Sequence, residues 1–314
     1  MAPRGLTLCL VVCSLRAVAS SSPSCHISSR NTSASVTCSH FSSPSDFEHF
    51  IQRPLSHPTL RFLLKDSRLE ALPSGAFVDV SATSLELSNV SIASFAIAES
   101  NPFAGLEASL EAITFSDGSS LPETWAIFKD LHRLSNVSLT NLSLVNLTRD
   151  FGLLPTSVTH VLVRASPIGY VDEDWLGALP NLQEVSVEDS HLTVFLRSML
   201  PKPAAALTTL ELRGNNLTLL PKDFGDDLPA LRQLDLSHNQ ITTLEEESLR
   251  HLQITVTRVS LFGNPLHCDC QLRFLLTFPD IWRHAECASP PELRDRNASL
   301  SDVTEADLQC AQST

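Results

Sequence analysis

Apolar residues recur along the chain with a period of 24 or 25 residues, and their spacing inside each period is also constant. The clearest unit runs from Leu207 to Leu217 and is apolar at its first, fourth, sixth and eleventh positions, with Asn at the ninth. Two further units in the same register begin at Leu231 and Val256. Three units that agree at this many positions indicate a repeat architecture in which every unit builds the same structural element.

The register continues towards the N-terminus, where the pattern weakens. Clear first positions fall at Leu182, Val158, Leu134 and Leu110, and weaker units begin near Ala82 and Thr59. About nine repeats therefore span residues 59–266. One unit cannot bury its apolar face alone, whereas stacked units share a continuous core, so the period predicts a solenoid. Unrelated amphipathic helices, the alternative, would show a period of about 3.6 residues and do not explain the common register.

The spacing inside a unit also predicts local structure. The fourth and sixth positions lie on one side of a short strand, because alternate side chains of a strand point to the same face. The chain then turns away and returns along the opposite, convex side, where each unit ends with a bulky residue. We expect these residues to pack one coil on the next; they are Phe77, Phe103, Phe128, Phe151, Trp175, Met199, Phe224 and Leu249.

The ninth position carries Asn in the last three units, where an inward-turned side chain would bond to backbone groups of neighbouring coils. These residues are Asn215, Asn239 and Asn264. Earlier units carry, in order, Ser67, Val90, Gly118, Leu142, Ser166 and Ser190 there. The N-terminal two thirds of the repeat region is therefore the less regular part, and its repeat borders are less well defined.

The pattern LxxLxLxxNxL resembles the leucine-rich repeat, and the likeness extends over about residues 25–310. The resemblance implies an α/β-type solenoid, a leucine-rich-repeat horseshoe of about nine repeats with a concave parallel β-sheet, an irregular or short-helical convex side and disulfide caps. Secreted and ectodomain proteins of this kind mostly bind other proteins or glycans. We therefore expect a signal peptide at 1–19, an N-terminal cap at 20–58, repeats at 59–266 and a C-terminal cysteine cap at 267–314.

The N-terminus has the features of a cleaved secretory signal. Arg4 supplies positive charge, an apolar run covers residues 6–15, and the Ala-Val-Ala segment at 17–19 offers a cleavage site before Ser20. A membrane anchor is the alternative, but the run is shorter than about 18 residues and Arg16 interrupts it. Elsewhere the sequence has no apolar run of membrane-spanning length, and its C-terminus has no lipid-anchor or retention signal.

Four cysteines follow the last repeat, and they are Cys268, Cys270, Cys287 and Cys310. Their spacing resembles the C-terminal cysteine cap of extracellular leucine-rich-repeat proteins, which implies the pairs Cys268–Cys287 and Cys270–Cys310. The sequence alone allows two other pairings. A zinc site is a further alternative, although C-x-C fits the usual zinc spacing poorly and a secretory route favours disulfides.

Two more cysteines, Cys25 and Cys38, bracket a short segment before the first repeat. They resemble a reduced N-terminal cap that has one disulfide where many relatives have two. Cys9 and Cys13 would leave with the signal peptide, so six cysteines remain and can form three bridges. A solenoid needs such caps because its core would otherwise be exposed at both ends.

Charge and sequons narrow the choice of partner. Without Arg4 and Arg16, 20 of the 22 Lys and Arg remain beside 35 Asp and Glu, which gives a net charge near −15. That balance argues against nucleic acid, heparin-like polyanions and anionic lipid as partners. Seven Asn-x-Ser/Thr sequons in a chain with a secretory signal favour N-glycosylation at most of them, namely Asn31, Asn89, Asn136, Asn141, Asn146, Asn216 and Asn297.

Motifs for catalysis are missing from the sequence. It contains no Gly-x-Ser-x-Gly elbow, no His-Glu-x-x-His helix and no phosphate-binding loop, and it has only 10 glycines. The acidic runs 172–174 and 245–247 could suggest calcium, but both lie on return segments, where solvated loops are more common. His267 is interpreted as an exposed cap residue, and Ser74 lacks the acidic flank of a glycosaminoglycan attachment site. We therefore expect no enzyme activity, no metal and no cofactor.

The outward positions of the concave strands are the remaining candidates for a binding site. From the fourth repeat onward they include Asn136, Ser138, Leu162, Ser186 and Arg213 among others. The predicted ligand-binding residues are His160, Arg164, Glu184, Glu188, Glu211, Arg213, Gln233, Asp235, Arg258 and Phe262. An ordinary polar sheet face is the alternative interpretation of the same residues.

Three sequons affect which part of the concave face is expected to bind a partner. Asn136 and Asn141 fall on or beside the concave face in the fourth repeat, and Asn89 falls at the matching edge in the second. Glycans there would obstruct the N-terminal half of the face. We therefore expect protein contact on the fifth to ninth repeats, centred on Arg164, Glu188, Arg213 and Asp235.

Three functions from different classes fit these features. The leading one is extracellular recognition by a soluble receptor, decoy or innate-immune binder. A second is a non-catalytic subunit that stabilises a secreted enzyme, as in the arthropod luciferase accessory proteins that share this architecture. A third is a matrix or adhesion component. The expected ligand is an extracellular protein or glycan, and because related solenoids form dimers through the concave face, a homodimer is a further candidate.

Overall fold

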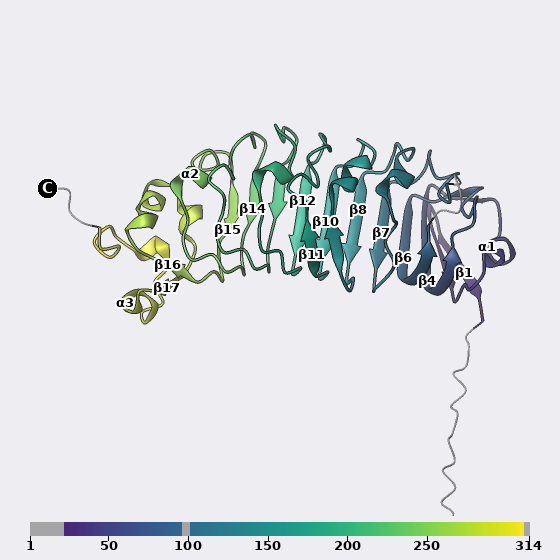
Figure 1. The fold of residues 1–314 in the computed structure, drawn as a ribbon, viewed down its shortest axis with the longest axis horizontal. Coiled ribbons are helices and arrows are strands. Elements are labelled where there is room, and N and C mark those ends of the chain that lie inside the picture. Colours follow the sequence, from purple (N-terminus) through teal and green to yellow (C-terminus); the bar gives the residue numbers. More distant parts are fainter. Residues whose placement is uncertain (1–21, 96–100, 311–314) are drawn as a thin grey trace, which may run out of the picture.

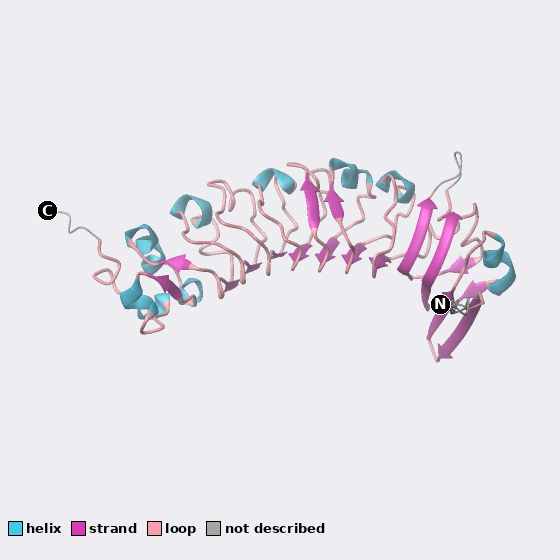
Figure 2. Ribbon diagram, turned by 60° about the horizontal axis from the view of Figure 1, so that its bottom comes forward, coloured by secondary structure: helices cyan, strands magenta, loops and turns pink. Residues whose placement is uncertain are grey.

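The computed structural model describes residues 22–95 and 101–310. They form a shallow arc of stacked coils in which short strands follow one face and short helices follow the other (Figure 2). The N-terminal hairpin and the C-terminal helical cap lie at opposite ends of the arc (Figure 1). The predicted signal peptide at 1–19, with Cys9 and Cys13, lies outside the described residues.

One sheet runs the whole length of the solenoid. In the described residues it has 11 strands, in the order β1-β2-β4-β6-β7-β8-β10-β12-β13-β14-β15. Strand β1 is antiparallel to β2, and every later pair is parallel. The strands are β1 (Ser24–Arg30), β2 (Ser33–Ser39), β4 (Thr59–Ala71), β6 (Ser84–Ser94), β7 (Ala112–Ser116), β8 (Asn136–Thr140), β10 (His160–Arg164), β12 (Glu184–Glu188), β13 (Thr209–Glu211), β14 (Gln233–Asp235) and β15 (Arg258–Ser260).

Short helical turns and two-stranded sheets complete the coils and the caps. The helical turns are α1 (Ser45–Phe50), η1 (Trp125–Phe128), η2 (Arg149–Leu153), η3 (Arg197–Met199), α2 (Glu246–Leu249), η4 (Cys270–Thr277), η5 (Asp280–Arg283), α3 (Pro291–Arg294) and η6 (Leu300–Asp302). The small sheets pair β3 (Leu55–Ser56) with β5 (Val80–Ser81), β9 (Val145–Leu147) with β11 (Ile168–Val171), and β16 (Leu266–His267) with β17 (Cys287–Ser289).

The predicted α/β-type solenoid is confirmed. Within the described residues, nine parallel strands from β4 to β15 correspond to the nine predicted repeats. Register is constant between neighbours: Val161 of β10 pairs with Val137 of β8 on one side and Val185 of β12 on the other. Equivalent positions therefore form rows across the sheet, and the inward rows are buried. In the first unit the predicted core position Thr59 is exposed, and its neighbour Leu60 is buried instead.

The bulky residues predicted for the convex side are all buried, and most of the aromatic ones contact one another in a column. The ring centroids of Phe77 and Phe103 are 5.9 Å apart, and those of Phe103 and Phe128 are 4.8 Å apart. Trp125, which the repeat pattern did not predict, bridges the next step at 5.8 Å from Phe128 and 4.3 Å from Phe151. Adjacent coils are thus joined on the convex side by ring packing.

The ninth-position asparagines bond across coils as predicted. The Asn215 carboxamide oxygen accepts from the backbone N–H groups of Ser190 and Leu192 at 3.2 and 3.0 Å. Its NH₂ group donates to carbonyl oxygens of the preceding coil and of its own coil at 2.6 and 3.0 Å. Asn239 and Asn264 also accept from the preceding coil and donate to carbonyls of both coils. Each buried amide therefore satisfies backbone groups that the turn leaves unpaired.

Serine hydroxyls have the equivalent role in the earlier units. The hydroxyl groups of three serines each accept from a backbone N–H of the preceding coil and donate to the carbonyl two residues earlier in their own coil. These residues are Ser67, Ser166 and Ser190. In the third unit the predicted ninth residue, Gly118, is wrong: the bonding residue is Ser119, whose Oγ accepts from a backbone N–H at 3.0 Å. Two consecutive residues, Asp117 and Gly118, have positive φ here and shift the next side chain by one position.

The eighth position has a left-handed backbone in every unit. These residues are Asp66, Asn89, Asp117, Asn141, Ala165, Asp189, Gly214, His238 and Gly263, with φ between 48° and 74°. Gly, Asn and Asp tolerate this conformation best, which accounts for most of the row. The sequon residues Asn89 and Asn141 belong to it, and each donates to an Asp of the preceding unit at 2.8 Å. Their backbone conformation thus favours Asn there whether or not a glycan is attached.

Disulfides close both ends of the solenoid. In the described part of the chain they are Cys25–Cys38, Cys268–Cys287 and Cys270–Cys310. The C-terminal pairing is the one that the family resemblance implies, among the three that the sequence allows. The zinc alternative is wrong, because a disulfide-bonded cysteine has no thiolate to offer a metal.

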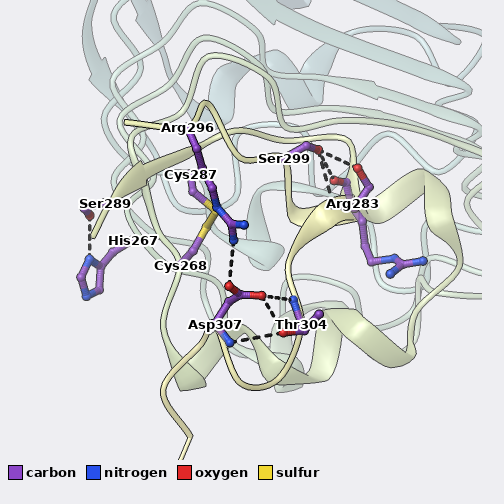
Figure 3. The surroundings of a disulfide bond; sticks show 10 residues. His267, Cys268, Arg283, Cys287, Ser289, Arg296, Ser299, Thr304 and Asp307 are labelled. Atoms are coloured by element: carbon purple, nitrogen blue, oxygen red, sulfur yellow. Dashed lines mark hydrogen bonds and ion pairs between the residues drawn. A yellow bond between two sulfur atoms is a disulfide. The ribbon is translucent and has the colours of Figure 1, made fainter. Parts of the chain in front are cut away.

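The C-terminal cap covers the last coil with short helices and a buried Trp282. Beside the Cys268–Cys287 disulfide, hydrogen bonds to Asp307 also hold the cap together (Figure 3). Arg296 Nη2 donates to the Asp307 carboxylate at 2.8 Å, and the backbone N–H of Thr304 donates to it at 2.9 Å. The hydrogen bonds from Thr304 and the nearby guanidinium hold the pKa of Asp307 below its usual value. No helix in residues 22–95 and 101–310 is long and apolar enough to span a bilayer.

Candidate functional site

The ten predicted ligand-binding residues lie on the outward face of the sheet between β10 and β15. Arg164, Arg213, Arg258 and Phe262 are exposed, whereas Glu188 is only 5% exposed. The remaining five are half-buried, and they are His160, Glu184, Glu211, Gln233 and Asp235. Strand alternation thus predicts which face each residue is on, but it does not predict that Glu188 is covered by its neighbours.

Glu188 is the centre of an ion-pair network. Its carboxylate accepts from Arg164 Nη2 at 2.9 Å and from Ser186 Oγ at 2.7 Å, and Arg213 Nη2 lies 4.0 Å away. The register causes the first contact, because Arg164 and Glu188 are paired positions of neighbouring parallel strands. The side chains of Arg164 and Arg213 are 52% and 49% exposed. One buried carboxylate therefore orients two arginines whose other donors face solvent.

A hollow of about 310 Å³ lies over this network. Its lining residues are Arg164, Glu188, Asp189, Glu211, Arg213 and Asp235, and we call it the concave charged hollow. Asp189 was missed by the sequence analysis, although it directly follows Glu188. It occupies the left-handed eighth position and lies 3.9 Å from Arg213 Nη2. Gly214 of the next unit lies directly beside it, so a Cβ at that position would meet the Asp189 carboxylate and require that side chain to move.

The acids of the hollow differ in their readiness to ionise. Burial alone would raise the pKa of Glu188, but hydrogen bonds from Arg164 and Ser186 and the charges of both arginines outweigh it and lower that pKa. The pKa of Arg164 is raised by the same pair. Burial and the nearby charge of Glu188 raise the pKa of Glu211, although its carboxylate accepts from Gln233 at 2.7 Å. The hollow thus combines one firmly ionised acid with one that is more easily protonated.

The other predicted residues lie at the margins of this network. His160 Nε2 is 4.0 Å from Glu184 at one side of the hollow. At the far end, the Phe262 ring lies edge-on to His238, with centroids 5.3 Å apart. Arg258 is paired in register with Gln233 on the adjoining strand. The structure therefore brings Arg164, Glu188, Glu211, Arg213 and Asp235 together, and it leaves the remaining five predicted residues around them.

The sequons occupy several faces of the solenoid. Six of the seven asparagines are exposed, and they are Asn31, Asn89, Asn141, Asn146, Asn216 and Asn297. Asn136 is half-buried on β8, where its carboxamide oxygen accepts from Ser135 Oγ at 2.6 Å. The seven are thus spread from the β1–β2 turn to the C-terminal cap, and Asn136 and Asn141 lie at the N-terminal side of the charged hollow.

The acidic runs form ion pairs rather than a cage of converging carboxylates. Asp172 accepts from the backbone N–H of Arg149 at 2.8 Å, and the Arg149 side chain lies 3.6 Å from Asp174. In the second run, Lys222 Nζ lies 3.0 Å from Glu247. Groups of three or more His, Cys, Asp or Glu side chains arranged to hold a metal are absent from the described residues.

Comparison with known proteins places the chain among repeat proteins. The family model described as leucine rich repeat matches residues 205–266, which contain the three units with Asn at position nine. Toll-like receptor 9 of Mus musculus is 24% identical over 157 residues, which cover 48% of this chain and 15% of that receptor. Trophoblast glycoprotein of Mus musculus is 30% identical over 136 residues, which cover 33% of this chain and 31% of that protein. The chain spans less than a third of the length of either protein.

A longer match is the non-catalytic subunit of Oplophorus-luciferin 2-monooxygenase from Oplophorus gracilirostris. It is 22% identical over 274 residues, which cover 78% of this chain and 74% of that subunit. Among solved structures, a chain of the octameric complex of Latrophilin 3, Unc5D and FLRT2 (LRR) matches with a TM-score of 0.58 and 19% identity, over 80% of this chain and 83% of that one. The repeat pattern, the long parallel sheet, the disulfide caps and these matches together show that the chain is built of leucine-rich repeats and resembles leucine-rich-repeat proteins of the extracellular type.

Proposed function

We propose that this chain is a secreted, non-enzymatic binding protein that recognises a partner protein through the concave face of its C-terminal half. The observation that carries the proposal is the concave charged hollow, in which buried Glu188 orients the half-exposed guanidinium groups of Arg164 and Arg213. Donors held in place before binding lose less side-chain entropy when a partner arrives. Arginine is also enriched at protein interfaces, where its planar fork pairs with carboxylates.

Two further observations support this location and class. Asn136 and Asn141 would carry glycans on or beside the N-terminal part of the face, which directs protein contact towards β10 to β15. Disulfide caps fit a protein that folds in an oxidising, extracellular environment. One relative is named as a non-catalytic subunit, in keeping with a role in binding.

A binding assay with charge reversal tests the proposal. The secreted, glycosylated protein is screened against a panel of recombinant extracellular domains by biolayer interferometry, and each binder is retested with Arg213→Glu. We expect at least tenfold weaker binding, about 1.4 kcal/mol, because the variant places a third carboxylate beside Glu188 and Asp189. Arg149→Glu is the matched control, since it reverses a 74% exposed arginine on η2, at the convex side. Equal binding by Arg213→Glu and wild type, or a loss in the control alone, would contradict the proposal.

Peptide mass spectrometry tests the restriction to the C-terminal half. We expect a mature N-terminus near Ser20 and glycans at Asn136 and Asn141. Bare sequons at both positions would leave the whole concave face open and would contradict that restriction.

A second candidate function is an accessory subunit of a secreted enzyme. The match to the Oplophorus non-catalytic subunit favours it, because that match covers about three quarters of both chains: 78% and 74%. Purification of the secreted chain from its natural source would then yield an enzyme of constant stoichiometry, whose activity decays faster once the chain is removed. Purification without associated activity would rule this function out.

A further inference from the structure

A second hollow lies on the outward face of the sheet at the other end of the solenoid. It covers about 350 Å³ over β1, β2 and the start of β4, and we call it the cap hollow. Its polar lining consists of Ser28, Arg30, Ser33, Ser35, Thr59 and Arg61, all of them exposed. Ala34 is the other lining residue and is buried below them.

The two arginines of the cap hollow lack acidic partners. Neither guanidinium has a hydrogen bond or an ion pair within the described residues, whereas Arg164 and Arg213 both contact Glu188. The acid on the adjoining strand β6, Glu86, is paired in register with Leu63 rather than with Arg61, and it accepts from Ser116 Oγ. In a chain with 35 Asp and Glu against 22 Lys and Arg, two unpaired arginines in one hollow mark a local site for an anion.

The register places hydroxyl groups between the two charges. Arg30, Ser33 and Thr59 form one row across the three strands, and Ser28, Ser35 and Arg61 form a neighbouring row two residues along. Strands lie about 4.8 Å apart and residues rise about 3.3 Å along a strand, so the two arginine backbones, two strands and two residues apart, are separated by about 12 Å across β2. The floor between them carries four hydroxyl side chains and no exposed apolar side chain. Hydroxyl groups that both donate and accept match the hydroxyl groups of a sugar ring.

We propose that the cap hollow binds an acidic sugar, a saccharide unit that carries a sulfate or carboxylate group. The oxyanion lies between the guanidinium groups of Arg30 and Arg61, where charge-assisted hydrogen bonds are strongest. The sugar hydroxyls bond to the serine and threonine side chains of the floor. The net charge of the whole chain repels a long polyanion, but a single acidic unit interacts mainly with the nearby arginines, because salt screens charges beyond about 8 Å.

The acidic sugar has two sources that share this chemistry. One is a glycan of another molecule. The other is the protein's own glycan at the sequon Asn31, which is exposed in the turn between β1 and β2, one residue from Arg30. A glycan attached there reaches the hollow without a second molecule.

Titration with small sugars tests the site. The probes are sialyllactose and N-acetylglucosamine 6-sulfate, with lactose and N-acetylglucosamine as neutral counterparts, followed by saturation-transfer NMR at about 0.15 M salt. We expect each acidic sugar to bind at least tenfold tighter than its neutral counterpart. Arg30→Ala and Arg61→Ala should each weaken binding at least tenfold. Lys65→Ala, on β4 but outside the hollow, should change it less than twofold.

Three outcomes would overturn the proposal. They are equal binding of acidic and neutral sugars, unchanged binding by both arginine variants, and binding of sodium sulfate or a polyglutamate peptide as tight as that of the acidic sugars. Arg213→Glu, which tests the proposed protein contact, should leave sugar binding unchanged, so the two proposals fail independently.

The Asn31→Gln variant identifies the source. If the protein's own glycan occupies the hollow, its removal frees the site and sialyllactose binds at least threefold tighter. If the sugar comes from another molecule, the affinity does not change. Both results require an acidic-sugar site in the hollow.

Discussion

The N-terminal and C-terminal repeats build the same sheet with different internal supports. In the last three units a buried amide, such as that of Asn215, accepts and donates several backbone hydrogen bonds at the turn after the strand. In the first two units the strands continue through that turn, since β4 has 13 residues and β6 has 11, whereas β13 to β15 have 3 each. Residues 67–71 of β4 pair with residues 90–94 of β6.

The difference shows two solutions to one requirement. Backbone N–H and C=O groups buried at the turn must be paired. The C-terminal units pair them with an amide side chain, and the N-terminal units pair them with a longer β-ladder and a serine hydroxyl. The family model matches only residues 205–266, where the amide solution is used. The units with Asn at the ninth position are therefore easier to recognise from sequence than the units that use a serine hydroxyl and a longer β-ladder.

The largest expected effect is on the amide support. Asn215→Ala leaves backbone groups on two coils without partners, and each orphaned group costs about 1–3 kcal/mol, so we expect a loss of about 3 kcal/mol in the free energy of unfolding. Urea denaturation followed by tryptophan fluorescence measures it. The neighbouring exposed residue supplies the control, Asn216→Ala, which should change stability by less than about 0.5 kcal/mol after enzymatic deglycosylation of both variants. A loss equal to the control would mean that the amide is not a support.

A smaller effect is expected for the serine support. Ser119 Oγ accepts from the N–H of Val90 and donates to the carbonyl of Leu87 at 2.9 Å. Ser119→Ala should cost about 1–2 kcal/mol, because one buried N–H loses its partner while the neighbouring ladder remains. Ser84→Ala, on the outward face of β6 and outside every sequon, is the control and should be neutral within about 0.5 kcal/mol. A loss as large as that of Asn215→Ala would erase the contrast between the two supports.

The charged hollow should respond to pH in two opposite ways. The pKa of Glu188 is lowered in the folded state, so its contribution to stability is present above its unfolded pKa of about 4.3 and is lost as pH falls through the folded value. The pKa of Glu211 is raised in the folded state, so its ionisation costs stability at neutral pH, and protonation removes that cost as pH falls through the raised value.

Glutamine variants separate these two contributions. Glu188→Gln should lose about 1 kcal/mol at pH 7 and should show a shallower loss of stability on acidification. Glu211→Gln should gain up to about 0.5 kcal/mol at pH 7. Unfolding free energies between about pH 3 and pH 7 measure both, and the same sign for both variants at pH 7 would contradict the assigned pKa directions.

The smallest expected change is a gain at the eighth position. Ala165 has φ of 48° in a row otherwise occupied by Gly, Asn, Asp and His. A left-handed backbone costs a Cβ-bearing residue about 1–2 kcal/mol, and part of this is offset by the greater unfolded-state entropy of Gly. Ala165→Gly should therefore raise stability by about 0.5 kcal/mol. Destabilisation in urea denaturation would show that this turn tolerates Ala without strain.

Much of the fold could be predicted because the repeat encodes it locally. The spacing from Leu207 to Leu217 specifies which side chains face the core, and repetition specifies the stacking. The disulfide pairing of the C-terminal cap needed the family resemblance, since four cysteines allow three pairings. The prediction failed at Gly118, because two consecutive left-handed residues moved the bonding role to Ser119. The same shift moves the following apolar residue from the eleventh position, Ser120, to Leu121.

For the candidate site, the sequence predicted which side of the sheet each residue lies on, but not which residues contact one another. Strand alternation indicates that Arg164, Glu188 and Arg213 lie outward, because side chains two residues apart share a side of the sheet. That Glu188 is buried, that Asp189 joins the hollow and that Arg30 and Arg61 remain unpaired depend on contacts between different coils. The repeat spacing within one coil does not predict which charged side chains of the next coil will contact it.

By itself, therefore, the sequence determined the solenoid, its direction of burial and the cysteines available to close it, because these follow from spacing along one chain. The tertiary structure alone decided how the strands line up and hence which charges meet. Register between coils of 24 or 25 residues brings residues far apart in sequence to within one strand spacing. The interaction between two charges is strongest at such short distances. Which side chains face one another across neighbouring strands therefore decides which arginines are paired with an acid and which are not.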